Sequence, residues 1–286
     1  MSKALAKYSF KPILSGYMNS TESHHTVPFF QYEGDARRAS TQDLIGEEPL
    51  SILIEGQPYS VVMRTPGQEI FHVAGFCLGE GLVDRPEDFT TIGYCEDMDP
   101  NVVTASLHPE RRKKVADLLK RKGFISQTSC GICGKEMIKD ISRTVTPITN
   151  EATIKLSQAI ECADKLAQHQ ELYEKTRGSH AVMIYDSQFN VMAVAEDVGR
   201  HNALDKAIGK VFMDGQLGRA SLAVLSSRIS YELVQKAGRA RLPILISFSR
   251  PTALAVEFAQ ALNMTLACRG EDSELLVFCG DERLRR

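Results

Sequence analysis

The 286-residue chain is predicted to be an α/β protein whose C-terminal part forms a parallel sheet covered by helices. From residue 179 onward, β-rich and helix-periodic segments alternate with short connections, which is typical of such sheets. Hydrophobic residues make up 43% of the chain and charged residues 24%, which indicates an ordinary globular protein able to bury a large core. The net charge of −2 argues against a general nucleic-acid-binding role.

The N-terminal half divides into an arm and a small α+β unit. Residues 1–45 are polar and follow no regular pattern, so we expect a loosely attached arm or edge segment. Two β-rich runs flank the turn at residues 55–58 and predict a hairpin over residues 49–64. The further elements expected in this unit are a helix over 66–82, a strand over 101–109 and a helix over 110–123.

The C-terminal half begins with a long helical stretch over residues 153–176, where apolar residues recur three and four apart. A hairpin is then expected over residues 179–197. The alternating elements after it are helices over 201–213, 230–240 and 251–263 and strands over 220–227 and 242–248.

Three strand-to-helix turns carry the polar residues of interest in this half. In an open α/β sheet, ligands gather at the carboxyl ends of strands, where helix N-termini present free N–H groups. Each turn combines an arginine with hydroxyl groups or a glycine at a helix start, which suits a phosphate-bearing anion. The turns contain Glu196, Asp197, Gly199, Arg200 and His201; Ser226, Ser227, Arg228 and Ser230; and Ser247, Ser249, Arg250 and Thr252. The alternative is that Asp197, Ser227 and Ser249 are helix N-caps and the arginines are solvated.

Two histidines in this region are candidate ligand or proton-handling groups. His201 and Asp205 are four residues apart and therefore share one helical face, with Lys206 adjacent. A structural contact is the more common outcome for such a pair, so a catalytic role for His201 is the weaker hypothesis. His180 enters a strand after a glycine, where it either faces a ligand or lies at the sheet edge.

The seven cysteines are odd in number, and the N-terminus lacks an apolar stretch long enough for a signal peptide. No apolar run approaches the roughly 18 residues of a membrane span. We therefore expect a cytoplasmic protein without a disulfide framework, in which most cysteines are reduced and several are small buried apolar groups.

The sequence QTSCGICGKEM, residues 127–137, places Cys130 and Cys133 two residues apart between glycines. Structural zinc needs four ligands, and a second CxxC or an HxxxH is absent, so a zinc site is the weaker alternative. A thioredoxin-like pair should follow a buried strand, whereas the preceding residues are mostly polar. The remaining interpretation is a reactive thiol. A helix start and Lys135 would lower the pKa of such a thiol, and a thiolate can take up sulfur from a persulfide.

Five segments together resemble one known family, the formate dehydrogenase accessory sulfurtransferases of the FdhD/NarQ type. SCGICG combined with EDVGRHNALDK is far more specific than a lone CxxC, and the likeness covers nearly everything after residue 45. The segments are residues 47–82, SCGICG at 129–134, EDVGRHNALDKAIG at 196–209, residues 226–238 and residues 252–270.

The resemblance implies a fold and an activity. The family fold is a cytidine deaminase-like α/β/α core with a smaller N-terminal α+β domain, which implies an arm over residues 1–45, a small domain over 46–128 and the core over 129–286. A cysteine desulfurase would load sulfur onto Cys130 as a persulfide, with Cys133 assisting or resolving. The sulfur would pass to a bis-molybdopterin guanine dinucleotide molybdenum cofactor destined for formate dehydrogenase. Members are typically homodimers.

The resemblance also implies a cofactor-binding turn near the C-terminus. Its match is Arg269, Gly270, Glu271, Asp272, Ser273 and Glu274, where acids stand in place of an expected basic residue. Those acids would repel a pyrophosphate unless they face away from it or bind the guanine edge. Ser227, Arg228, Arg200 and His201 complete the expected cofactor site, and we expect no permanently bound metal.

Two other functions are weighed against the sulfurtransferase. One is a chaperone that binds the molybdenum cofactor without persulfide chemistry, so that the cysteines are dispensable. The other is a zinc-dependent deaminase-like hydrolase, although the H-x-E and P-C-x-x-C motifs of zinc deaminases are absent.

Overall fold

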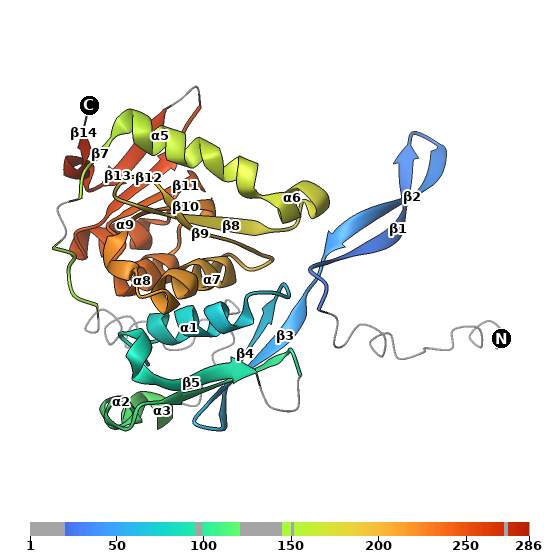
Figure 1. The fold of residues 1–286 in the computed structure, drawn as a ribbon. Coiled ribbons are helices and arrows are strands. Elements are labelled where there is room, and N and C mark those ends of the chain that lie inside the picture. The colour runs from blue at the N-terminus through green and yellow to red at the C-terminus, as the bar shows by residue number, and fades with distance from the viewer. Residues whose placement is uncertain (1–20, 95–98, 121–144, 150–151, 272–273, 286) are drawn as a thin grey trace, which may run out of the picture.

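The fold was obtained as a computed structural model, which describes residues 21–94, 99–120, 145–149, 152–271 and 274–285. Two β-sheets of different size lie on opposite sides of a layer of helices, and a two-stranded ribbon projects from the smaller unit (Figure 1). Cys130 and Cys133 and the turn residues Asp272 and Ser273 lie outside the described residues.

The larger sheet has six strands in the order β13-β12-β11-β10-β8-β9. Its strands are β8 (His180–Asp186), β9 (Val191–Asp197), β10 (Ala220–Arg228), β11 (Ile244–Ser249), β12 (Thr265–Arg269) and β13 (Leu275–Cys279). The parallel arrangement predicted from the sequence is confirmed for β10 and β11, and the hairpin for β8 and β9. Strand β12, which was not predicted, pairs in parallel with β11. Since β8 and β13 are antiparallel to their neighbours β10 and β12, the sheet as a whole is mixed, as the α/β class allows.

Helices cover both faces of this sheet. On one face, α5 (Leu156–Lys165) buries a core that includes Cys162, Tyr185 and Ile246. The helices on the other face are α7 (Arg200–Met213), α8 (Tyr231–Arg239) and α9 (Ala253–Ala261). The continuous helix predicted over 153–176 is wrong: strand β7 (Ile154–Lys155) pairs with β14 (Leu284–Arg285), and α5 is followed by a 3₁₀ turn and α6 (Glu171–Thr176).

The smaller sheet has four strands in the order β4-β3-β6-β5. Strands β3 (Glu48–Ile54) and β4 (Gln57–Arg64) form the predicted hairpin, and β6 (Val102–Leu107) pairs in parallel with β3. The edge strand β5 (Phe89–Tyr94) was not predicted. Helix α1 (Glu69–Gly79) lies on the inner face, and the helical run after β6 is broken into α2 (Pro109–Lys114) and α3 (Ala116–Lys120).

The two sheets share one hydrophobic core through the crossing of α1 and α7. A Cβ atom at Gly75 of α1 would overlap the carbonyl oxygen of Asp205, and one at Gly209 of α7 would overlap that of Phe71. The backbones therefore touch at this crossing, and no larger residue fits. The core continues from Ile52 of β3 across this crossing to the larger sheet.

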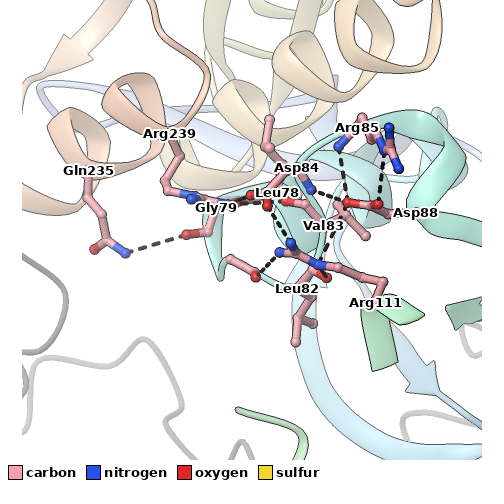
Figure 2. A network of polar contacts seen from close by, with 11 residues as sticks. Leu78, Gly79, Leu82, Val83, Asp84, Arg85, Asp88, Arg111, Gln235 and Arg239 are labelled. Atoms are coloured by element: carbon pink, nitrogen blue, oxygen red, sulfur yellow. Dashed lines mark hydrogen bonds and ion pairs between the residues drawn. The ribbon is translucent and has the colours of Figure 1, made fainter. Parts of the chain in front are cut away.

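A clasp of two arginines holds the chain that leaves α1 (Figure 2). Arg111 and Arg239 both pair with Asp84, and their remaining N–H groups donate to carbonyl oxygens of residues 78–83 at 2.7–3.1 Å. Because Arg239 belongs to α8 and Arg111 to α2, the clasp joins the two halves of the molecule.

The arm contains regular structure where the sequence showed no pattern. Strands β1 (His24–Glu33) and β2 (Ala36–Ile45) pair along their full length as an antiparallel ribbon. The tip of the ribbon points away from the body, and α6 lies near its root (Figure 1). Most side chains of both strands are exposed, so neither face of the ribbon has the periodic apolar pattern that predicts a strand.

Candidate functional site

The three polar turns meet at one edge of the larger sheet, as the sequence predicts. In the strand registers, Arg228 pairs with Ser249, Ser247 with Cys268, and His180 with Asp197. The carboxyl ends of β9, β10, β11 and β12 and the start of β8 therefore form a continuous rim. Along it lie the residues of the turns at 197–201, 226–230, 247–252 and 269–271.

Asp197 organises the start of α7 instead of remaining available to a ligand. This fully buried carboxylate accepts hydrogen bonds from the amides of Gly199 and Thr65 at 2.8 and 3.1 Å and from the Asn202 side chain at 2.9 Å. It also pairs with Lys206 Nζ at 2.7 Å, and Lys206 donates to the Thr65 carbonyl at 2.8 Å. The network ties the loop after β4 to α7, so the smaller unit fixes the position of the rim.

His201 faces the neighbouring helix across the rim. Its Nε2 lies 2.7 Å from Glu232 Oε2 and 3.4 Å from Ser230 Oγ, which places three polar groups at the first turns of α7 and α8. The hydrogen bond from His201 lowers the pKa of Glu232. Asp205, on the same face of α7, bonds Lys236 and not His201, so the predicted His201–Asp205 contact is replaced by two interhelical pairs.

Arg200 provides the cationic group of this cluster. Its Nε is buried and has no hydrogen-bond partner within the described chain. Burial lowers the pKa of His180, and the nearby charge of Arg200 lowers it further, so the two side chains share one corner of the rim. A buried N–H without a partner is uncommon and suits an acceptor brought by a ligand.

The N-caps of the rim helices are not the residues that the sequence suggested. The capping positions of α7, α8 and α9 are Gly199, Ser230 and Thr252, and of these only the Thr252 side chain accepts a hydrogen bond from its helix. Ser227 is buried in β10, where its hydroxyl donates to the Arg228 carbonyl at 3.4 Å. The alternative reading of Asp197, Ser227 and Ser249 as N-caps is therefore wrong.

The side chains of Arg228 and Arg250 are exposed on the rim. They stand at the ends of adjacent parallel strands, where the registers bring residues 228 and 249 opposite each other. With Arg200 they provide three positive charges around one edge.

The turn after β12 is stabilised internally. Arg269 bonds both carboxylate oxygens of Asp164 in α5 at 2.8 and 3.3 Å and the carbonyl oxygens of Gly270 and Glu274 at 3.3 and 3.1 Å. The Gly270 amide donates to the Glu274 carbonyl at 2.9 Å, and a Cβ atom at Gly270 would collide with the Glu274 side chain. The guanidinium of Arg269 is thus already occupied, while Glu271 is exposed.

The four described cysteines are free and buried, in agreement with the prediction that most of the seven are reduced and that several are small buried groups. Burial raises the pKa of Cys77, Cys268 and Cys279, and raises that of Cys162 to about 11. At neutral pH these groups are thiols shielded from partners. The other cysteines, Cys95, Cys130 and Cys133, lie outside the described residues.

Within the described ranges, no three histidine, cysteine, aspartate or glutamate side chains converge as metal ligands would. The helices in this part of the chain also include none that is long and apolar enough to cross a membrane.

Sequence reasoning missed Glu232, the partner of His201. The sequence feature that pointed to Glu232 is its position in the first turn of the helix after strand β10. The packing of α8 against α7, which brings Glu232 to His201, could not be predicted from that position. It also missed a cavity of about 440 Å³ between the loop 65–68, residues 194–196 of β9 and the start of α6.

Fold and rim together define a mixed α/β protein with a cationic sheet edge and, among the described residues, four buried free cysteines. The FdhD/NarQ family profile matches residues 45–285, and the chain belongs to this family. Two relatives are named sulfur carrier protein FdhD. The one from Xanthomonas euvesicatoria is 33% identical over 87% of this chain and 88% of its own length. The one from Mycobacterium tuberculosis is 34% identical over 93% of this chain and its own entire length.

A solved structure shares the fold. It is described as a formate dehydrogenase accessory protein from Desulfotalea psychrophila and aligns with a TM-score of 0.74 at 18% identity, covering 92% of this chain and 100% of its own. The cytidine deaminase-like character of the core stays a prediction.

Proposed function

We propose that this protein is a sulfurtransferase that accepts sulfur from a cysteine desulfurase as a persulfide on Cys130. It passes that sulfur to the molybdenum cofactor of a formate dehydrogenase. The observation that carries the proposal is the division of the cysteines. Four are buried thiols with raised pKa values, whereas SCGICG, in a family whose relatives are named sulfur carriers, holds a closely spaced pair.

The loading step is a thiol exchange that needs no added oxidant. The Cys130 thiolate attacks the outer sulfur of the desulfurase persulfide, a new S–S bond forms, and the desulfurase cysteine leaves as a thiolate. A low thiol pKa favours this step at neutral pH because it raises the thiolate fraction.

Cys133 resolves the persulfide. Its thiolate attacks the inner sulfur on Cys130, which releases hydrosulfide as a ligand for molybdenum and leaves a Cys130–Cys133 disulfide. The two thiols thereby supply the two electrons that convert sulfane sulfur to sulfide. A cellular dithiol reductant then restores both thiols for the next cycle.

Some of the rim arginines are available to bind the guanine dinucleotide tails of the cofactor, and one is already bonded within the protein. Arg200, whose buried Nε has no hydrogen-bond partner among the described residues, and the exposed Arg228 offer donors to phosphate oxygens beside Ser227 and His201. Arg269 would have to give up Asp164 to do the same, so we assign phosphate contacts to Arg200 and Arg228 first. The turn that includes Gly270, Glu271, Asp272, Ser273 and Glu274 is assigned to the guanine edge, whose N–H groups suit carboxylate acceptors.

Complementation tests this function. In a strain that lacks its own copy of the gene, the wild-type chain should restore formate dehydrogenase activity, whereas Cys130→Ala should not. Cys162→Ala is the matched control, because that cysteine is buried and the proposal gives it no role in transfer. Full activity with Cys130→Ala would contradict the proposal and favour a cofactor-binding chaperone that needs no persulfide.

A further inference from the structure

Strand β9 ends the larger sheet, and its outer edge is open. Its neighbour on the other side is β8, with which it pairs antiparallel. Ala181 of β8 stands opposite Glu196, but the Ala181 amide donates at 2.8 Å to Ser226 of β10, on the far side of β8. Bonded and non-bonded pairs alternate in an antiparallel ladder, so the N–H and C=O groups of Glu196 and Val194 point away from the sheet. Within the described chain, no backbone group bonds to them there.

The cavity of about 440 Å³ lies against this open edge. The loop 65–68 bounds it where β9 ends, because Thr65 Oγ1 accepts a hydrogen bond from the Val198 amide at 3.0 Å. Helix α7 contributes Lys206 to one wall, and the start of α6 forms the opposite wall. The main chain of residues 194–196 is therefore accessible to a ligand that enters between these walls.

The walls of the cavity carry an excess of negative charge. Glu196 already accepts hydrogen bonds from two amides of α6 and from the Ser179 hydroxyl. Lys206 is paired with Asp197 at 2.7 Å, so its charge is compensated within the protein. Glu171 is exposed at the start of α6 and forms no hydrogen bond or ion pair with the described residues. The free carboxylate of Glu171 therefore favours a ligand with a positive charge on the α6 side.

Lys206 keeps one donor on the α7 side of the cavity. Its side chain is only 2% exposed, and its ammonium bonds Asp197 and the Thr65 carbonyl at 2.7 and 2.8 Å. An ammonium group has three N–H donors, and the third finds no acceptor among the described residues. A buried donor without a partner is costly, so a ligand oxygen on this side of the cavity is stabilised.

We propose that the cavity binds an extended segment of a partner protein, which pairs antiparallel with β9 as a further strand of the larger sheet. Side chains of a strand alternate between its faces. Val194 and Glu196 face α6, and Ala195 faces α7. A ligand residue opposite Glu196 therefore points toward Glu171, and the next one, opposite Ala195, points toward Lys206. The site selects lysine or arginine followed by a residue with a hydroxyl or amide side chain.

A peptide suits this site better than a small anion does. An anion at Lys206 would lie close to Asp197, and Glu171 and Glu196 line the same cavity, so it would meet repulsion. A main chain instead offers donors and acceptors to the outward groups of β9, and such unpaired edge groups are a template for another strand. The proposal rests on β9 and its cavity and not on sulfur transfer, so it stands or falls independently of the proposed function.

A short peptide with this pattern tests the charge of the site. Fluorescein-labelled Val-Lys-Thr-Lys-Val amide is titrated with the full-length protein, and binding is followed by fluorescence anisotropy. Glu171→Lys should weaken binding at least about tenfold, because it turns attraction into repulsion. Glu174→Lys is the matched control, since Glu174 is also exposed on α6 but does not line the cavity. Equal affinities of the two variants, or no saturable binding to the wild type, would overturn the proposal.

Backbone methylation of the same peptide tests the strand pairing. In the antiparallel arrangement, the two lysines stand opposite Glu196 and Val194 and donate their amides to β9, whereas the threonine amide, opposite Ala195, points away. N-methylation of the first lysine should therefore weaken binding at least about tenfold, and N-methylation of the threonine should change it less than about twofold. An equal loss from both modifications, or a loss from the threonine alone, would overturn the antiparallel pairing with β9.

Discussion

Asp205 of α7 and Lys236 of α8 form a buried ion pair, with both carboxylate oxygens 2.8 Å from Nζ, one helical turn below the His201–Glu232 pair. Both pairs join the same two helices at a spacing of four residues. The deeper pair therefore sets the separation of α7 and α8, and with it the geometry of His201 and Glu232 at the rim.

Breaking the deeper pair should strongly destabilise the protein. Asp205→Asn leaves the buried Lys236 charge without the carboxylate that is bonded to it, and we expect a loss of about 3–5 kcal/mol in the free energy of unfolding, measured with urea. The exposed pair of Lys210 and Asp214 on the same helix is the control, and Asp214→Asn should cost less than about 0.5 kcal/mol. Equal effects of the two substitutions would refute this role for Asp205.

The crossing of α1 and α7 should tolerate no side chain. Gly75→Ala and Gly209→Ala each place a Cβ atom into a backbone carbonyl of the facing helix, so we expect a loss of roughly 3 kcal/mol or more, or failure to fold. Gly218→Ala is the control, because a Cβ there meets no atom within 4 Å. Thermal unfolding monitored by circular dichroism compares the three variants, and a stable Gly75→Ala protein would show that the helices are farther apart.

His72 should make stability depend on pH. Burial, followed by the charges of Lys206 and Lys236, lowers its pKa well below the usual value, and neither ring nitrogen has a hydrogen bond of normal geometry in the described chain. The unfolded chain thus binds a proton below about pH 6.5 that the folded chain does not, so stability falls as pH falls.

The contribution of His72 is isolated by His72→Leu. Between about pH 6 and 5, the wild type should lose up to about 1.4 kcal/mol per pH unit more than the variant, measured by urea unfolding at each pH. His180, whose pKa is also lowered, remains in both proteins and cancels in the difference. Identical slopes would mean that His72 binds a proton in the folded state.

The cationic rim should bind guanine nucleotides. Arg200→Ala removes a charged donor beside the start of α7, and we expect roughly tenfold weaker binding of GDP by isothermal titration calorimetry. Lys113→Ala on α2 is the control, because its side chain is 75% exposed in the smaller unit and pairs with its neighbour Glu110. Unchanged affinity in Arg200→Ala would move the phosphate site away from this corner.

Local pattern was sufficient to predict the alternation of strands and helices and the convergence of Arg200, Arg228 and Arg250 on one rim. These follow from periodicity and from the rule that parallel strands end at one edge. Local pattern did not predict β13 or the β1–β2 ribbon. These strands are defined by the strands with which they pair, and not by an alternating pattern of apolar residues.

The same limit applies within the site. That His201 and Asp205 share a face of α7 could be predicted from their spacing, but their partners Glu232 and Lys236 come from another helix. Only the packing of α8 reveals them. The bond between Arg269 and Asp164 could not be predicted from the sequence either, because 105 residues separate the two.

The most direct test of the account is intact-protein mass spectrometry after incubation with a cysteine desulfurase and cysteine. Wild type and Cys133→Ala should gain one sulfur atom that reducing agent removes, and Cys130→Ala should gain none. Sulfur that loads equally well onto Cys130→Ala, or no gain in any of the three proteins, would contradict the claim that Cys130 carries the persulfide.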